Sequence, residues 1–115
     1  MKFDLKKELK KIFVSPESTV RDVIENLNKT QLKISIVIDK NNKLIGTIVD
    51  GDIRRGLLNG INLKDKINKI IQKNPIVVST KIKENEALTI MRENFLQHIP
   101  IINEVKKPIG LFTLE

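Results

Sequence analysis

The chain lacks cysteine, tryptophan and tyrosine, and it has one histidine, His98, among its 115 residues. The absence of cysteine excludes disulfides, thiolate zinc sites and cysteine nucleophiles, and a single histidine excludes a multi-histidine metal centre. No serine lies in a Gly-x-Ser-x-Gly turn, and no glycine-rich phosphate loop ends in Lys-Ser or Lys-Thr. Catalysis would depend on carboxylates, lysines and arginines, so we expect a protein that is not an enzyme and holds no metal ion.

Long apolar runs are also absent, since none approaches the roughly 18 residues that suggest a membrane-spanning helix. The N-terminal stretch MKFDLKKELKKIF alternates charged with apolar residues and lacks the continuous apolar stretch of a signal peptide. We expect a cytoplasmic protein without a membrane partner. The same stretch predicts an amphipathic helix that leads into the first strand, with apolar residues Phe3, Leu5, Leu9, Ile12 and Phe13.

The formal net charge of +7 raises the question of nucleic-acid binding, because lysine and arginine neutralise phosphates. The lysines are spread along the chain, the only adjacent arginines are Arg54 and Arg55, and the phenylalanines fit the apolar pattern. No tryptophan or tyrosine is present to stack on bases. The charge therefore favours a solvated lysine-rich surface, and we expect no nucleic-acid partner.

The two halves of the sequence match when the chain is aligned with itself at an offset of 64 residues. Identical residues coincide in strand-like segments, and apolar spacing is kept where identity is lost, as for Val23 and Ala87. Self-similarity at a fixed period indicates two copies of one structural unit. The identical pairs include Val14 and Val78, Ser15 and Ser79, Ile38 and Ile102, Lys43 and Lys107, Ile45 and Ile109, and Gly46 and Gly110.

The pattern of apolar residues, caps and turns in the first copy predicts a β-α-β-β-α unit. A short strand at 12–14 precedes a helix capped by Ser18 or Thr19, and KNN forms the turn between strands 34–39 and 43–49. A second helix follows Asp52 and ends at Asn59-Gly60, a left-handed C-cap. Its inward residues are expected to be Ile53, Leu57 and Leu58.

The second copy repeats this order with strands at 76–79, 99–103 and 108–113 and a helix near 85–95. An amphipathic linker helix within 61–73 is expected between the copies and ends before Pro75. The final helix of the unit is missing at Glu115, so we expect the natural protein to continue. The apolar residues of these helices are Leu63, Ile67, Ile70 and Ile71 in the linker and Ala87, Leu88, Met91 and Phe95 in the second copy.

The strand-to-helix corners carry the sequence Gly46-Thr47-Ile48-Val49-Asp50-Gly51-Asp52, and Gly110-Leu111-Phe112-Thr113 at the second copy. These segments resemble the ligand motif of cystathionine-β-synthase (CBS) domains: Gly, hydrophobic, any residue, Ser or Thr, any two residues, Asp. The resemblance implies an α/β (α+β) tandem CBS pair whose repeats pack sheet to sheet about a pseudo-twofold axis. The expected boundaries within the single module 1–115 are 10–60 for repeat 1, 61–73 for the linker helix and 74–115 for a C-terminally truncated repeat 2.

The resemblance also implies a site between the repeats. The motif carboxylate, Asp52, would accept hydrogen bonds from ribose hydroxyls, and the Ser or Thr would contact phosphate beside a helix N-terminus. Copy one has Val49 at that position, whereas copy two has Thr113 but ends before the aspartate. The other candidate ligand-binding residues are Arg54 and Arg55 for the phosphate, Asp50 as a cap, and His98 and Pro100 at a strand entry lining the cleft.

Alternatives remain at this corner. Asp50 and Asp52 also suit helix caps, and two carboxylates separated by one glycine are a weak magnesium signal. The predicted function is a regulatory module that senses an adenosine-type ligand, with AMP, ATP or S-adenosylmethionine as candidates and a homodimer as the assembly. KLIGTIVDGDIRRGLLNG is also similar to CBS pairs ahead of sugar-nucleotide nucleotidyltransferases. The alternatives are a dimerisation scaffold with degenerate ligand sites and, more weakly, a nucleic-acid binder.

Overall fold

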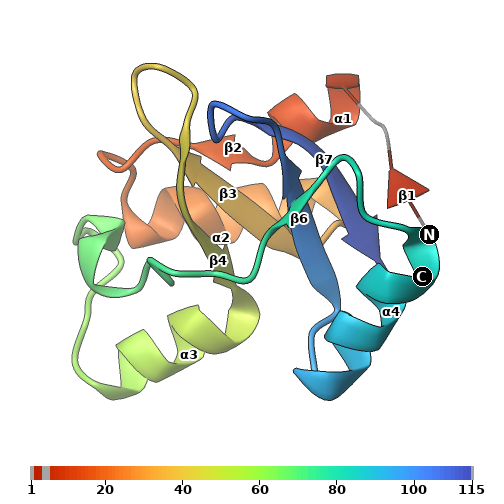
Figure 1. Cartoon of the computed structure of the whole chain (residues 1–115). Helices are drawn as coiled ribbons and strands as arrows, with labels where there is room; N and C mark the ends of the chain where they lie inside the picture. Colours follow the sequence, from red (N-terminus) through yellow and green to blue (C-terminus); the bar gives the residue numbers. More distant parts are fainter. Residues whose placement is uncertain (1, 4–5, 115) are drawn as a thin grey trace.

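The computed structural model describes residues 2–3 and 6–114 of the chain (Figure 1). Within these residues, no helix is long and apolar enough to cross a membrane. The helices are α1 (Lys6–Lys11), α2 (Val20–Thr30), α3 (Asp50–Leu58) and α4 (Glu84–Glu93), with one 3-10 turn, η1 (Ile67–Lys69). The strands are β1 (Lys2–Phe3), β2 (Phe13–Val14), β3 (Ile34–Ile38), β4 (Leu44–Val49), β5 (Val78–Ser79), β6 (His98–Ile102) and β7 (Pro108–Thr113).

The two repeats form two sheets of matching design. In the first, β2 pairs parallel with β3, and β3 pairs antiparallel with β4. In the second, β5 pairs parallel with β6, and β6 antiparallel with β7, while β1 adds antiparallel to the free edge of β7. Both hairpins shift register at equivalent points, between Val37 and Ile38 and between Ile101 and Ile102, 64 residues apart. The predicted internal repeat is therefore present in the backbone.

The strand β3 lies between two apolar clusters, which explains its continuous apolar sequence. Val37 packs in the core of the first repeat with α2 and α3. Ile34 and Ile36 face the other way, into a cluster that contains Leu111 of the second repeat and Leu9 of α1. Full burial of such a side chain contributes roughly 1.5–3 kcal/mol. The cluster shared by the two repeats joins the sheets, so the predicted packing of two α+β repeats against each other is present.

The N-terminal segment is divided between β1 and α1. Of the apolar residues in the predicted lead-in helix, Leu9 is buried within α1 and Ile12 is buried just after it. Phe3 belongs instead to β1, opposite Leu111. Leu5 lies outside the described residues.

The predicted linker helix over 61–73 is wrong, because only η1 is helical there. The linker makes several of its backbone hydrogen bonds with other parts of the fold. The Asp65 carbonyl accepts from the Val20 amide at 2.9 Å, and the Ile67 amide donates to the Ser18 carbonyl at 3.1 Å. Ile67 and Ile70 are nevertheless buried as their apolar character indicated, since the segment packs against the first repeat.

Two apolar residues of α3 and one that follows α4 were expected to face inward and are exposed instead. Helix α3 buries Ile53 and packs Gly56 closely against Ile70, but it leaves Leu57 43% and Leu58 81% exposed. It also begins at Asp50, before the predicted start. Helix α4 ends at Glu93, so Phe95 lies beyond the core stripe and is 95% exposed. The predicted left-handed turn after α3 is present at Gly60, with φ +96°.

Candidate functional site

A cleft of about 570 Å³ lies between the repeats. Its walls come from the β4–α3 corner of the first repeat, the linker after η1, and the α4–β6 connection of the second repeat. In Figure 1, α3 and the α4–β6 connection lie on the same side of the molecule. The lining residues are Lys33, Ile34, Thr47, Val49, Asp50, Gly51, Asp52, Arg55, Gln72, Asn74, Pro75, Ile76, Asn94, Phe95, Leu96, Gln97, His98 and Pro100.

Gly46 allows the linker to form one of these walls. A Cβ atom at this position would lie 2.3 Å from the carbonyl oxygen of Gln72, so any side chain would displace the linker. The next residue, Thr47, exchanges two backbone hydrogen bonds with Gln72, at 3.1 and 2.9 Å. These contacts bring Pro75 and Ile76 to the cleft. The glycine of the motif is thus required by a close backbone approach.

Asp52 is fixed in the cleft wall by two hydrogen bonds. Its Oδ2 accepts from the backbone amide of Val49 at 2.9 Å, and its Oδ1 accepts from Nη2 of Arg55 at 2.8 Å. The side chain is 16% exposed. The carboxylate in the first turn thus caps α3 by accepting from the amide of the N-cap residue Val49, whose own side chain makes no capping hydrogen bond. The capping role is therefore confirmed for Asp52.

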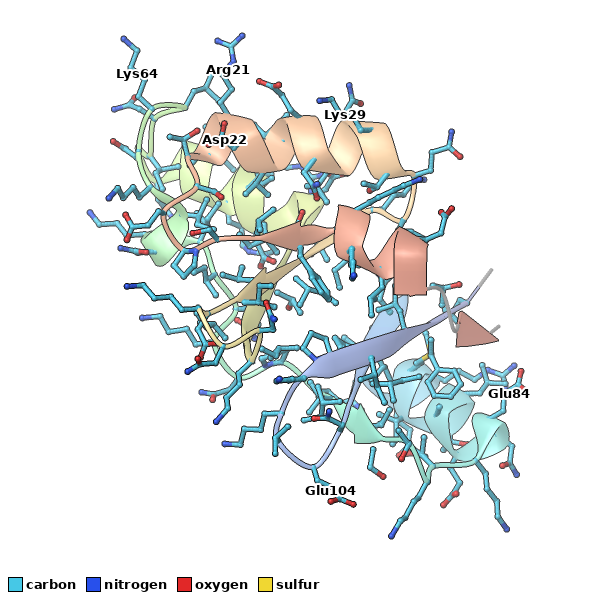
Figure 2. The ribbon with its side chains drawn as sticks, turned by 90° about the horizontal axis from the view of Figure 1, so that it is seen from above. Arg21, Asp22, Lys29, Lys64, Glu84 and Glu104 are labelled. Atoms are coloured by element: carbon cyan, nitrogen blue, oxygen red, sulfur yellow. The ribbon has the colours of Figure 1, made fainter. Side chains whose placement is uncertain are left out.

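The same cap occurs at the start of α2 and α4, outside the cleft. Asp22 accepts from the amide of Thr19 at 2.9 Å, and Glu86 accepts from the amide of Lys83 at 3.1 Å. The backbone hydrogen bond from Thr19 lowers the pKa of the Asp22 carboxyl. Figure 2 shows Asp22 on the outer surface, at the opposite end of the molecule from Glu84 of α4. What distinguishes Asp52 from these two carboxylates is its place in the cleft.

The structure brings most of the predicted site residues together. Asp50, Asp52, Arg55, His98 and Pro100 all line the cleft. Asp50 is exposed, and α3 uses Asp52 rather than Asp50 to cap its first turn.

Two predicted residues lie elsewhere. Arg54 is exposed and does not line the cleft, because neighbouring helix positions point in different directions. Thr113 lines a separate cavity of about 60 Å³, with His98 on its border. The Thr113 hydroxyl is buried and has no hydrogen-bond partner within the described part of the chain.

Sequence reasoning missed the linker wall and the mouth of the cleft. Gln72 was assigned to the linker helix, Ile76 to a strand and Phe95 to a helix core, while Asn74 lay between the predicted linker helix and that strand. Lys33 was also missed, although the 64-residue shift places it opposite Gln97, which lines the cleft too. The repeat was the one signal that pointed to it.

The cleft combines an apolar wall with balanced formal charges. Pro75, Ile76, Leu96 and Pro100 supply apolar surface. The charged lining residues are two cationic and two anionic side chains, Lys33 and Arg55 with Asp50 and Asp52. No group of three or more histidine, cysteine or acidic residues within the described ranges is arranged to hold a metal ion. Such a cleft suits a small, partly polar organic ligand.

Comparisons with known proteins identify two matches to the CBS domain, at residues 7–59 and 67–115. Among curated proteins, an uncharacterised protein of Rickettsia prowazekii is 36% identical over 79% of this chain and 28% of its own length. Inosine-5′-monophosphate dehydrogenase of Methanocaldococcus jannaschii is 28% identical over 90% of this chain and 20% of its own. Arabinose 5-phosphate isomerase of Pseudomonas aeruginosa is 26% identical over 84% and 30%. The chain thus spans less than a third of each relative.

Solved structures share the fold. A CBS domain protein from Pyrobaculum aerophilum complexed with AMP has a TM-score of 0.80 at 18% identity, covering 90% of this chain and 79% of that one. A CBS domain pair in complex with 5′-methylthioadenosine and S-adenosyl-L-methionine has a TM-score of 0.80 at 20% identity, covering 89% and 80%.

Proposed function

Because the chain belongs to the CBS domain family, whose tandem pairs are regulatory modules rather than catalysts, we propose that it senses an adenosine-type ligand in the cleft between its repeats. One observation carries this proposal: a carboxylate, Asp52, is held in the wall of a cleft of about 570 Å³ that also offers apolar surface. Pockets of 300–1,000 Å³ are typical of small-molecule sites. The AMP, S-adenosylmethionine and 5′-methylthioadenosine bound to related folds support the ligand class.

The proposed ligand places its ribose at Asp52. A carboxylate has about four acceptor positions, so the two hydrogen bonds from Val49 and Arg55 leave capacity for ribose hydroxyls. The base lies against the apolar wall of Pro75, Ile76 and neighbouring residues. The ligand would therefore contact both repeats and the linker at once.

The 5′ end of the ligand meets a different environment. Val49 offers no hydroxyl, and Asp50 adds a negative charge at the start of α3, while Lys33 and Arg55 supply the positive charges of the cleft. AMP, ATP and S-adenosylmethionine differ mainly in the charge at the 5′ end. Their relative affinities therefore show which charge the cleft prefers there. We do not assign the ligand to the cavity at Thr113, because about 60 Å³ is too small for a nucleotide.

Ligand binding would act by population shift. A molecule that contacts both repeats favours the arrangement in which both walls are within reach, in proportion to its differential affinity. The three curated relatives described above are more than three times longer than the matched region, and two are named enzymes of nucleotide or sugar-phosphate metabolism. We propose that this module controls an attached enzyme of that chemistry, with a sugar-phosphate nucleotidyltransferase as the specific candidate.

The assembly proposed for the module is a homodimer. Leu57 and Leu58 project from α3 with 43% and 81% exposure, and a second copy of the chain would cover them. Sedimentation velocity of the wild type should show a dimer, and Leu58→Glu should shift it toward monomer. A wild type that remains monomeric at high micromolar concentration contradicts this part. A dimer that binds no ligand supports the scaffold alternative instead.

Calorimetric titration with AMP, ATP and S-adenosylmethionine tests the sensor function. Wild type should bind one of them saturably, and Asp52→Ala should weaken binding by roughly tenfold or more, because hydrogen bonds to a charged group are lost. Asp22→Ala is the matched control, since it removes the same cap outside the cleft. Equal weakening by both variants would assign the effect to helix capping, and absence of binding by wild type would refute the proposal.

A further inference from the structure

Phe95 is an exposed aromatic residue at the mouth of the cleft. It follows α4, lines the cleft, and is 95% exposed with φ +55°. Of the aromatic side chains in the described part of the chain, Phe112 is buried and Phe13 half-buried. Phe95 is therefore the phenylalanine that a molecule entering the cleft can reach, and the His98 imidazole lines the same cleft.

The left-handed backbone at Phe95 is a property of the repeat. Gln31, which precedes Phe95 by 64 residues, has φ +60° at the end of α2. At the second copy the turn is held by the amide of Leu96, which donates to the Met91 carbonyl at 2.8 Å, and by the packing of Leu96 on the second core. The fold thus requires a left-handed backbone conformation at this position, but it does not require an aromatic side chain.

Phenylalanine is a costly residue for this position. A bulky side chain at positive φ is strained, and glycine adopts this conformation without penalty. The exposed ring also gains almost nothing from burial within the chain. Since neither backbone nor packing explains the ring, its position in the lining of the cleft, together with Leu96 and Ile76, indicates a role in ligand binding.

We propose that Phe95 is a specificity-determining residue that stacks on the purine base of the bound ligand and covers the mouth of the cleft. This inference rests on the proposed function and adds the group that reads the base. An aromatic ring suits a flat heterocycle because every base has a π face, whereas ribose and phosphate gain little from it. Asp52 then holds the sugar and Phe95 the base.

Substitution distinguishes a residue that binds the ligand from one that stabilises the fold, because the two kinds of residue have different effects on affinity and stability. Phe95→Gly should relieve the strain at positive φ and raise the thermal midpoint by several degrees. The same variant should weaken binding of AMP or S-adenosylmethionine by about five- to a hundredfold, the range for loss of one base–aromatic stack. Binding of ribose 5-phosphate, which has no base, should be unchanged by the substitution.

The absence of tryptophan and tyrosine permits a direct optical test. Phe95→Trp places a single indole at the mouth of the cleft, and Val105→Trp is a control in the turn between β6 and β7, 51% exposed and outside the cleft lining. Titration with the adenine ligand should change the emission of the first variant and leave the second unchanged. Ribose 5-phosphate should change neither.

The outcomes separate the two proposals. If wild type and Phe95→Gly bind the adenine ligand equally while Asp52→Ala binds weakly, Phe95 does not read the base and the sensor function stands. If wild type binds none of the ligands, both proposals fall. A Phe95→Gly variant that loses stability, or that changes sedimentation without changing affinity, assigns the ring to the fold or to a second copy and overturns the inference.

Discussion

Replacement of Gly46 by alanine should push the linker at Gln72 away from β4 of the first repeat. The added Cβ would lie 2.3 Å from the Gln72 carbonyl oxygen and 2.5 Å from Cγ2 of Ile71. One of these atoms belongs to the backbone, which cannot rotate away as a side chain can. The linker must move outward, and the two hydrogen bonds between Thr47 and Gln72 are stretched or lost.

The magnitude follows from these two effects. Overpacking of a closed site costs about 1–3 kcal/mol, and each backbone hydrogen bond contributes about 0.5–1.5 kcal/mol net. The free energy of unfolding should therefore fall by about 2–6 kcal/mol, a large part of the 5–15 kcal/mol typical of a domain. Because the displaced linker carries Pro75 and Ile76, ligand affinity should fall as well.

Urea denaturation followed by circular dichroism measures the loss as a lower midpoint. Gly60→Ala is the control, because Gly60 has φ +96° but no atom within 4 Å of an added Cβ. That variant suffers backbone strain of about 1–2 kcal/mol without a steric clash. If Gly46→Ala unfolds at the same midpoint as wild type, or later than Gly60→Ala, the close approach of the linker is not what requires glycine at this corner.

Three further predictions concern single groups. The hydrogen bond from the Thr19 amide lowers the pKa of Asp22 in the folded state, so its stabilisation is present above the ordinary pKa of 3.8 and disappears as pH falls through the lower folded value. The urea midpoint of wild type should therefore drop more steeply below about pH 5 than that of Asp22→Asn; parallel curves would contradict the assignment. Val49→Thr should raise affinity for AMP by about two- to tenfold relative to adenosine in calorimetry, because it adds a hydroxyl beside the proposed 5′ group; an unchanged ratio places the phosphate elsewhere. Thr113→Val should raise the unfolding free energy by about 1–3 kcal/mol, since its buried hydroxyl has no hydrogen-bond partner in the described structure; a loss of stability would reveal a partner.

The site was only partly predictable. The Asp-Gly-Asp corner was found from its motif, and His98 and Pro100 from their place at a strand entry. The sequence assigned the ribose to Asp52 from the motif and the cap to Asp50, although both residues suit a helix N-terminus. The fold assigns the cap to Asp52, whose oxygen lies 2.9 Å from the Val49 amide.

Local pattern determined the repeat and its elements. The 64-residue period, the spacing of Val20, Val23 and Leu27, and the turn between β3 and β4 are properties of neighbouring residues, so each is visible in one dimension. Predictions that rest on such short-range features were confirmed at α2, β3 and β4.

Tertiary contacts decided what lies between and around these elements. The linker reads as a helix, yet residues far away in the chain supply its hydrogen bonds, at Ser18 and Thr47. Phe95 reads as part of a helix core, yet α4 ends two residues before it and the left-handed turn leaves its ring outside. The sequence by itself determined the two repeats and the acidic corner, because those depend on local spacing. Only the tertiary structure decided the cleft, because its walls come from segments whose meeting no local pattern encodes.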